Sequence, residues 1–119
     1  MSESITKKKD EKPKEENPES IYRIRPFYEM HFNRDDGSYD YEVHLAGVPK
    51  ENVELKVLPE FFVLRAKRTE GKSVGIYTLT RYFLNEIDPE TVKAEFNDGL
   101  LKFSVNIKDP LKDAYTIKL

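Results

Sequence analysis

Apolar and polar residues alternate along most of the chain from residue 21 onward. Tyr39, Tyr41, Val43 and Leu45 are separated by polar residues, and the same period of two recurs in 53–57 and 100–107. Such alternation is typical of strands with one buried face and one solvated face. No ten-residue window carries the apolar stripe of a helix, although 86–91 is compatible with a single turn. The pattern predicts strands at about 27–33, 39–45, 53–58, 61–66, 74–84, 92–96 and 100–107.

Short turn signals separate these segments. Asp36-Gly37 and Asp98-Gly99 supply the positive φ that tight hairpins require. Seven or eight short antiparallel strands joined in this way predict an all-β fold. We expect an immunoglobulin-like β-sandwich, in which each sheet buries its apolar face against the other.

The first 20 residues have a different composition. Most are charged, and Met1 and Ile5 are their only apolar side chains, so this stretch cannot offset the entropy lost on ordering. The run 7–9 of three lysines would suit an arm that binds nucleic acid, but acidic residues outnumber the lysines here, which favours a solvating tail. We therefore expect a disordered charged tail at 1–20, a β-sandwich domain at 21–108 and a C-terminal extension at 109–119.

Overall composition narrows the classes of function. The chain has 119 residues, no cysteine and a formal net charge of −2, so thiolate chemistry is excluded and a dedicated nucleic-acid binder is not expected. No apolar run approaches the length of a membrane span, and no signal peptide is visible. We expect a cytoplasmic protein with neither nucleic acid nor a membrane among its partners.

The residues that carry catalytic chemistry are sparse. His31 and His44 are the only histidines, too few for a histidine-based metal site. The carboxylates are spread as on a solvated surface, and no phosphate-binding glycine loop is present. We predict no catalytic, cofactor-binding or metal-binding residue, and therefore no enzyme.

Two apolar segments exceed what one strand face can bury. The run 61–64 is apolar on both faces, and Leu100-Leu101 interrupts the alternation of its strand. Such a surplus marks either a contact for another chain or a strand buried on both sides within its own domain. The sequence leaves both readings open. Most of the Tyr and Phe rings fall on inward positions, which favours core packing over stacking against nucleic-acid bases.

Several motifs together resemble the α-crystallin domain of small heat-shock proteins. They are the turn-and-strand segment 44–53 (HLAGVPKENV), the aromatic segment 81–84 (RYFL) followed by Ile87-Asp88-Pro89, and the hairpin segment 94–101 (AEFNDGLL). No one motif is specific, but their order and spacing match the family from about residue 39 to 107. The resemblance implies an α-crystallin-type sandwich.

The C-terminus adds an independent feature. Ile117-Lys118-Leu119 resembles the family's tail anchor, in which two branched side chains enter a groove on a neighbouring subunit. Residues i and i+2 of an extended segment lie on one side, although a β-rich chain can also end in this way by chance. By the resemblance, the receiving groove lies between a strand carrying Val53, Leu55 and Val57 and a strand carrying Val92, Ala94 and Phe96.

The chain also departs from the family pattern. Its first 20 residues are more hydrophilic than the family's N-terminal region, for which only 21–28 offers a substitute. The stretch between the strand that ends near Ala66 and the strand that contains Tyr82 is short for a loop strand that swaps into a partner. Val74, Ile76 and Tyr77 are the candidate dimer strand there, unless the dimer forms in another way.

The function that the resemblance implies is that of a small heat-shock protein. Such a holdase chaperone binds partly unfolded proteins without ATP or any other cofactor and prevents their aggregation. It forms dimers through strand exchange or edge pairing, and these assemble further into higher homo-oligomers through docking of the C-terminal tails. The alternative is a CS-type co-chaperone or scaffold module that binds one folded partner, and a carbohydrate-binding or enzymatic sandwich is a more distant rival.

Overall fold

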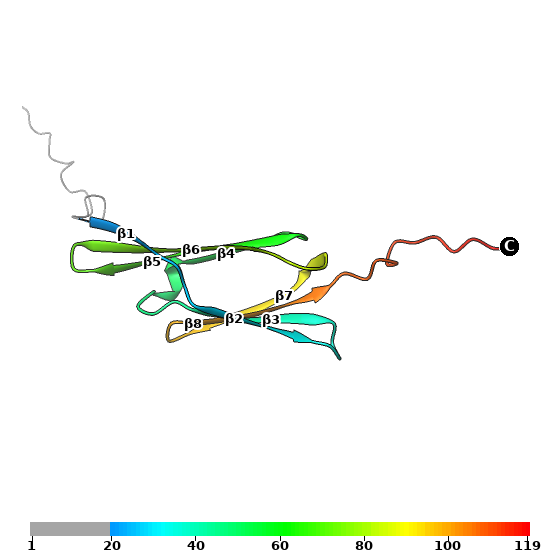
Figure 1. Cartoon of the computed structure of the whole chain (residues 1–119), viewed down its shortest axis with the longest axis horizontal. Coiled ribbons are helices and arrows are strands. Elements are labelled where there is room, and N and C mark those ends of the chain that lie inside the picture. The colour runs from blue at the N-terminus through cyan, green and yellow to red at the C-terminus, as the bar shows by residue number, and fades with distance from the viewer. Residues whose placement is uncertain (1–19) are drawn as a thin grey trace, which may run out of the picture.

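The computed structural model describes residues 20–119, which form two stacked four-stranded sheets (Figure 1). The first sheet has the strand order β1 (Ser20–Ile24), β6 (Ser73–Tyr82), β5 (Phe61–Glu70), β4 (Val53–Val57). The second has the order β2 (Tyr28–Asn33), β3 (Ser38–His44), β8 (Leu100–Ile107), β7 (Ile87–Asn97). All neighbouring strands are antiparallel except β1 and β6. The predicted all-β sandwich is confirmed, whereas the predicted tail lies outside the described residues except for Ser20.

The core consists of the inward positions of the central strands. Tyr41 of β3 stacks on Phe103 of β8 with ring centroids 4.8 Å apart, and Phe62 of β5 meets both rings edge-on from the opposite sheet. Offset and edge-on ring contacts of this kind add to the free energy gained by burying apolar area. Around them lie the fully buried side chains Val43, Leu45, Leu64, Ile87 and Val105. The alternation seen in the sequence is therefore the alternation between core and solvent.

Three elements differ from the sequence prediction. The single turn considered at 86–91 is part of β7, where the register against β8 shifts between Asp88 and Lys93. Within this bulge Asp88 accepts a hydrogen bond from the Glu90 backbone N–H at 3.0 Å, and the Thr91 hydroxyl donates to the Asp88 carbonyl at 2.7 Å. These local contacts replace ladder bonds, which breaks the alternation. A 3₁₀ turn, η3 (Lys50–Asn52), was also not predicted.

Strand β1 was missed because its partner is distant in the sequence. It runs parallel to β6, and Tyr22 and Ile24 lie over Gly75, where an added Cβ would come within 2.9 Å of the Tyr22 ring. Glycine at this position is what lets β1 approach. The Tyr22 hydroxyl donates to Glu70 at 2.7 Å and accepts a longer hydrogen bond from Arg68 at 3.4 Å. The bond from Arg68 to Tyr22 raises the pKa of the guanidinium above its ordinary value.

The same arginine ties the first sheet to the turn that precedes β4. Arg68 donates to the Ala46 carbonyl at 3.0 Å, and the Tyr77 hydroxyl donates to that carbonyl at 2.9 Å. Gly47 adopts a φ of +81°, and a Cβ on it would meet the Arg68 side chain at 3.1 Å. The turn at 46–47 is thereby fixed in place, and with it the entry into η3 and β4.

The C-terminal extension leaves the sandwich after β8. Its base is a turn at 109–114, in which the Lys112 N–H donates to the Asp109 carbonyl at 3.0 Å. Lys112 also forms an ion pair with Asp88 on β7, with 3.3 Å between Nζ and Oδ2. Beyond this base the chain runs away from both sheets to its end (Figure 1).

The ionisation of Tyr41 makes stability depend on pH in the alkaline range. Burial raises its pKa from 10.0 to about 12. The unfolded chain loses this proton near pH 10 while the folded chain keeps it to about pH 12, so the free energy of unfolding falls as the pH rises between those values. We expect Tyr41→Phe to remove this part of the fall. The free energy of unfolding, obtained from urea unfolding at a series of alkaline pH values, measures this difference. Tyr82→Phe, which changes an exposed ring, is the control. If the free energy of unfolding fell equally with pH in Tyr41→Phe and in the wild type, the fall would not come from Tyr41.

Two hydrogen-bond donors lower the pKa of the Asp88 carboxyl, which lies at the base of the extension. The hydrogen bond from the Glu90 N–H is the main cause, and Lys112 is the second. Because the folded-state pKa is depressed, the stabilisation is present at neutral pH and is lost as the pH falls through that lowered value. We expect Lys112→Met to raise the pKa of Asp88 only partly, since the backbone donor stays. A carboxyl NMR titration measures this, and a fully ordinary pKa in the variant would show that Lys112 alone was responsible.

Candidate functional site

One side of the sandwich is open between the edge strands β4 and β7. Each of these strands has a neighbour on one side only, β5 and β8 respectively. Their inward side chains face the space between the sheets without a further strand to cover them. The edge positions are therefore partly exposed although they belong to the apolar face.

A hollow of about 460 Å³ lies along this open side. Val53 and Leu55 line it from β4, and Ala94 and Phe96 line it from β7. The sequence predicted these four residues as part of a groove, and the structure brings them together. Val57 and Val92, predicted with them, are half-buried against the core and do not line this hollow. Whether the hollow receives a tail stays a prediction.

The hollow has further lining residues that the sequence analysis did not select. Leu101 on β8 lies opposite Phe96 in the register and is buried, so strand alternation was a signal that could have found it. Glu95 and Asn97 alternate with the predicted residues along β7, and they reach the rim because β7 is an edge strand. Lys50 enters from η3, an element that the sequence pattern did not show.

Local hydrogen bonds position both walls of the hollow. The Asn52 amide donates to the Lys67 carbonyl of β5 at 3.1 Å, which holds η3 at the start of β4. On the other side, the hairpin between β7 and β8 turns at Asp98 and Gly99, with φ of 49° and 81°. The positive φ expected there is confirmed. The Leu45 N–H donates to the Gly99 carbonyl at 2.6 Å and ties this hairpin to the turn after β3.

The residues of the predicted tail anchor lie far from any such hollow in their own chain. Ile117 is 73% exposed and Leu119 is fully exposed. Tyr115 and Leu111 on the same extension are exposed as well. The extension thus presents apolar side chains that its own sandwich does not cover, two of them with the i, i+2 spacing of an extended anchor.

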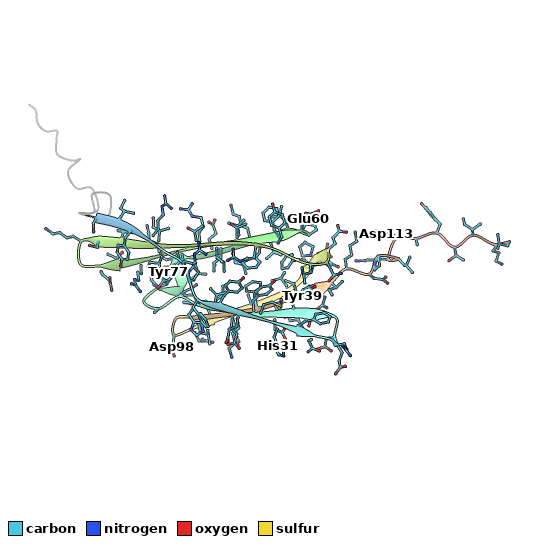
Figure 2. The ribbon with its side chains drawn as sticks, viewed as in Figure 1. His31, Tyr39, Glu60, Tyr77, Asp98 and Asp113 are labelled. Atoms are coloured by element: carbon cyan, nitrogen blue, oxygen red, sulfur yellow. The ribbon has the colours of Figure 1, made fainter. Side chains whose placement is uncertain are left out.

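The residues proposed as a dimer strand have a different place. Val74, Ile76 and Tyr77 lie inside β6, which pairs with β5 along one edge and with β1 along the other. Tyr77 points between the sheets (Figure 2) and is 4% exposed. The segment 67–76 is a hairpin with a tight turn at 71–72 instead of a loop. In this structure both edges of the segment are paired within the chain, and its role in dimerisation stays a prediction.

The run 61–64, for which two readings were open, divides between the faces of β5. Phe62 and Leu64 are fully buried in the core, whereas Phe61 and Val63 lie on the outer face. Phe61 contacts the ring of Tyr82 on β6 with centroids 5.1 Å apart. Tyr82 and the neighbouring Leu84 are 72% and 84% exposed. The surplus apolar surface is therefore real on this outer face.

Groups suited to metal or acid–base chemistry are dispersed. His31 and His44 are exposed on the outer side of the second sheet, where Figure 2 shows His31 pointing away from the sandwich. Among residues 20–119, no group of three or more His, Asp or Glu side chains is arranged to hold a metal ion. Within the same range, no helix is long and apolar enough to cross a membrane.

Comparison with known proteins places this geometry in a family. The model of the Hsp20/alpha crystallin family matches residues 31–118. Small heat shock protein C4 of Rickettsia felis is 28% identical over 89 residues, a match that covers 65% of this chain and 55% of the relative. The chain thus spans little more than half the length of that relative.

Solved structures share the fold at low sequence identity. Heat shock protein 16.0 from Schizosaccharomyces pombe superposes with a TM-score of 0.64 at 19% identity, covering 82% of this chain and 76% of that one. A small heat-shock protein from Xylella fastidiosa gives a TM-score of 0.64 at 10% identity, covering 79% and 94%. Because the family model spans most of the sequence and these sandwiches agree with it, the chain belongs to the Hsp20/alpha crystallin family of small heat-shock proteins.

Proposed function

We propose that this protein is an ATP-independent holdase that binds partly unfolded proteins and assembles with its own copies through its C-terminal extension. The observation that carries the proposal is the combination of an apolar hollow at the open side of the sandwich and an exposed Ile117 and Leu119 pair on an extension directed away from it. Membership of a chaperone family supports it. The Xylella fastidiosa relative is described as having a distinct high order structure, which supports self-association.

The extension has the reach and the chemistry for docking between subunits. Beyond the turn at 109–114, the segment 115–119 reaches roughly 17 Å from this base when extended. Burying two branched side chains gives about 3–5 kcal/mol before the cost of ordering the tail, so a single docked tail binds weakly. Several tails acting together hold an assembly that still opens reversibly. The hollow offers apolar walls at Val53, Leu55 and Phe96 and a rim with both charges, Lys50 and Glu95.

Holding an unfolded client requires exposed apolar surface on a particle that stays in solution. The outer-face ring pair of Phe61 and Tyr82, with the exposed Leu84 shortly after β6, provides such a surface. Charged residues make up 35% of the chain, and they counteract precipitation of the complex. Because binding an unfolded chain needs no bond to be made or broken, neither a catalytic residue nor a cofactor is required. We retain the cytoplasm as the predicted location.

The first test concerns tail docking. We expect Ile117→Gly with Leu119→Gly to lower the mass of the assembly, because both anchor side chains are removed. Thr116→Gly with Lys118→Gly, which changes the intervening and flanking residues by the same backbone substitution, is the matched control. Ala94→Glu should also lower the mass of the assembly, because it places a charged side chain in the groove that is proposed to receive the anchor. Ala94 is exposed, so this substitution leaves the core intact. Light scattering measures the mass, and an unchanged mass in both anchor and groove variants would refute docking.

The second test concerns the holdase activity. With ATP absent, we expect the full chain to suppress aggregation of a heated model protein at near-stoichiometric ratios. Tyr82→Ser with Leu84→Ser should require several-fold more protein for the same suppression, because the client surface is lost. Thr78→Ser with Thr80→Ser, at exposed polar positions of the same strand, is the control. A full chain that leaves aggregation unchanged at several-fold excess would overturn the proposed function.

A further inference from the structure

Four strands have an edge that pairs with no other strand of residues 20–119: β1, β2, β4 and β7. Free edges are templates for pairing with another chain, and proteins protect them with bulges, lysines or prolines. The edge of β7 is interrupted by its register shift, and the edge of β4 carries Lys56. Strand β2 pairs with β3 over its whole length without a shift and contains neither lysine nor proline. It is less protected than β4 and β7, and it is longer than β1.

The inner face of β2 is also incompletely covered. Met30 and Phe32 lie opposite the buried Tyr41 and Tyr39 on the core side of the sheet, yet they are 42% and 47% exposed. The first sheet does not extend over them. Only Tyr28 of this strand has a partner there, where Arg81 donates to its hydroxyl at 2.7 Å. An apolar strip therefore accompanies the free edge.

The register fixes which backbone groups of β2 point outward. The His44 N–H donates to the Phe27 carbonyl, so Phe27 and His44 are a hydrogen-bonded pair of the antiparallel ladder. Such pairs alternate along the strand. Glu29 and His31 consequently direct their backbone groups toward β3, while those of Tyr28, Met30 and Phe32 point to the free edge.

We propose that two copies of this chain pair β2 with β2, antiparallel, about a twofold axis at Met30. In this register Tyr28 lies opposite Phe32 of the partner subunit, and the two Met30 side chains face each other. All outward-pointing backbone groups of Tyr28, Met30 and Phe32 then form ladder bonds. Glu29 lies opposite His31 of the partner subunit in the closely spaced, non-hydrogen-bonded type of pair.

The charges select this register over its neighbours. An axis at Glu29 sets two carboxylates opposite each other, and an axis at His31 sets two imidazoles opposite each other and leaves the backbone of Tyr28 unpaired. Within its own chain Glu29 lies opposite Glu42, an unfavourable pair of like charges. The imidazole of the partner subunit's His31 gives this carboxylate a hydrogen-bond donor. With the axis at Met30, β2 is complementary to itself.

A second copy is also the occupant that the topology favours. The strands β5 and β6 are joined by the two-residue turn at 71–72, and both edges of β6 are paired, so the described chain offers no loose strand for the edge of β2. Pairing like with like satisfies both edges at once and closes the assembly as a dimer. This surface is separate from the hollow between β4 and β7, so the inference stands independently of tail docking and of holdase activity.

Cysteine cross-linking tests both the edge and the register, because the chain has no cysteine of its own. Glu29→Cys and His31→Cys chains are prepared separately and then mixed and oxidised. The proposed register brings position 29 of one chain to position 31 of the other, at a separation that a disulfide spans. We expect covalent dimers only in the mixture, approaching about half of the chains, the statistical share of mixed dimers. The same result is expected on a background ending at Thr116, which removes tail docking.

Strand β4 supplies a matched control. Glu54 and Lys56 have the same i, i+2 spacing on the outer face of β4, which is another edge strand. Within one chain the Lys56 Nζ lies 3.8 Å from the Glu54 Oε2. A mixture of Glu54→Cys and Lys56→Cys chains should give no covalent dimer, and a cross-link there would move the interface to β4 and overturn the proposal. Cross-linking of His31→Cys alone or Glu29→Cys alone would overturn the register. An oxidised but uncross-linked mixture of the β2 variants would overturn the interface itself.

Discussion

A two-layer sandwich of short strands can bury its central strands completely but not its edges. Here the stacking of Tyr41 on Phe103, with Phe62 set against both from the other sheet, holds the two layers together at their centre. The same packing leaves inward-facing side chains of β2, β4 and β7 with solvent on one side. The surfaces proposed to bind other chains are therefore a consequence of how the core is built.

The edges are not equivalent, and the differences are local. Between β4 and β7 lies a hollow whose walls are apolar and whose rim is charged. At β2 the apolar strip runs along a regular, unprotected backbone ladder. A hollow of that kind suits branched side chains on an extended segment, whereas a regular ladder suits another strand. One small sandwich can in this way offer two chemically different contacts to other chains.

The C-terminal extension has a fixed base and an exposed apolar end. Its base is fixed by a turn and by the pair of Lys112 with Asp88, while its apolar end has no surface of its own chain to cover it. A fixed base with an exposed end limits the volume that Ile117 and Leu119 explore, which in the proposed assembly raises their effective concentration near a neighbouring subunit. This arrangement is consistent with the proposed docking of tails between subunits.

The sequence by itself determined the all-β class, most of the strands and the inward face of each strand, because every second residue of a half-buried strand faces the core. It also placed Val53, Leu55, Ala94 and Phe96 on one groove through the family resemblance. Only the tertiary structure decided what depended on distant partners. The parallel strand β1 can approach β6 because Gly75 has no side chain, and side-chain hydrogen bonds stabilise the bulge at 88–93. Val74, Ile76 and Tyr77 lie on an interior strand because β1 and β5 flank it. Alternation reports which face of a strand is buried, but not which strand lies beside it.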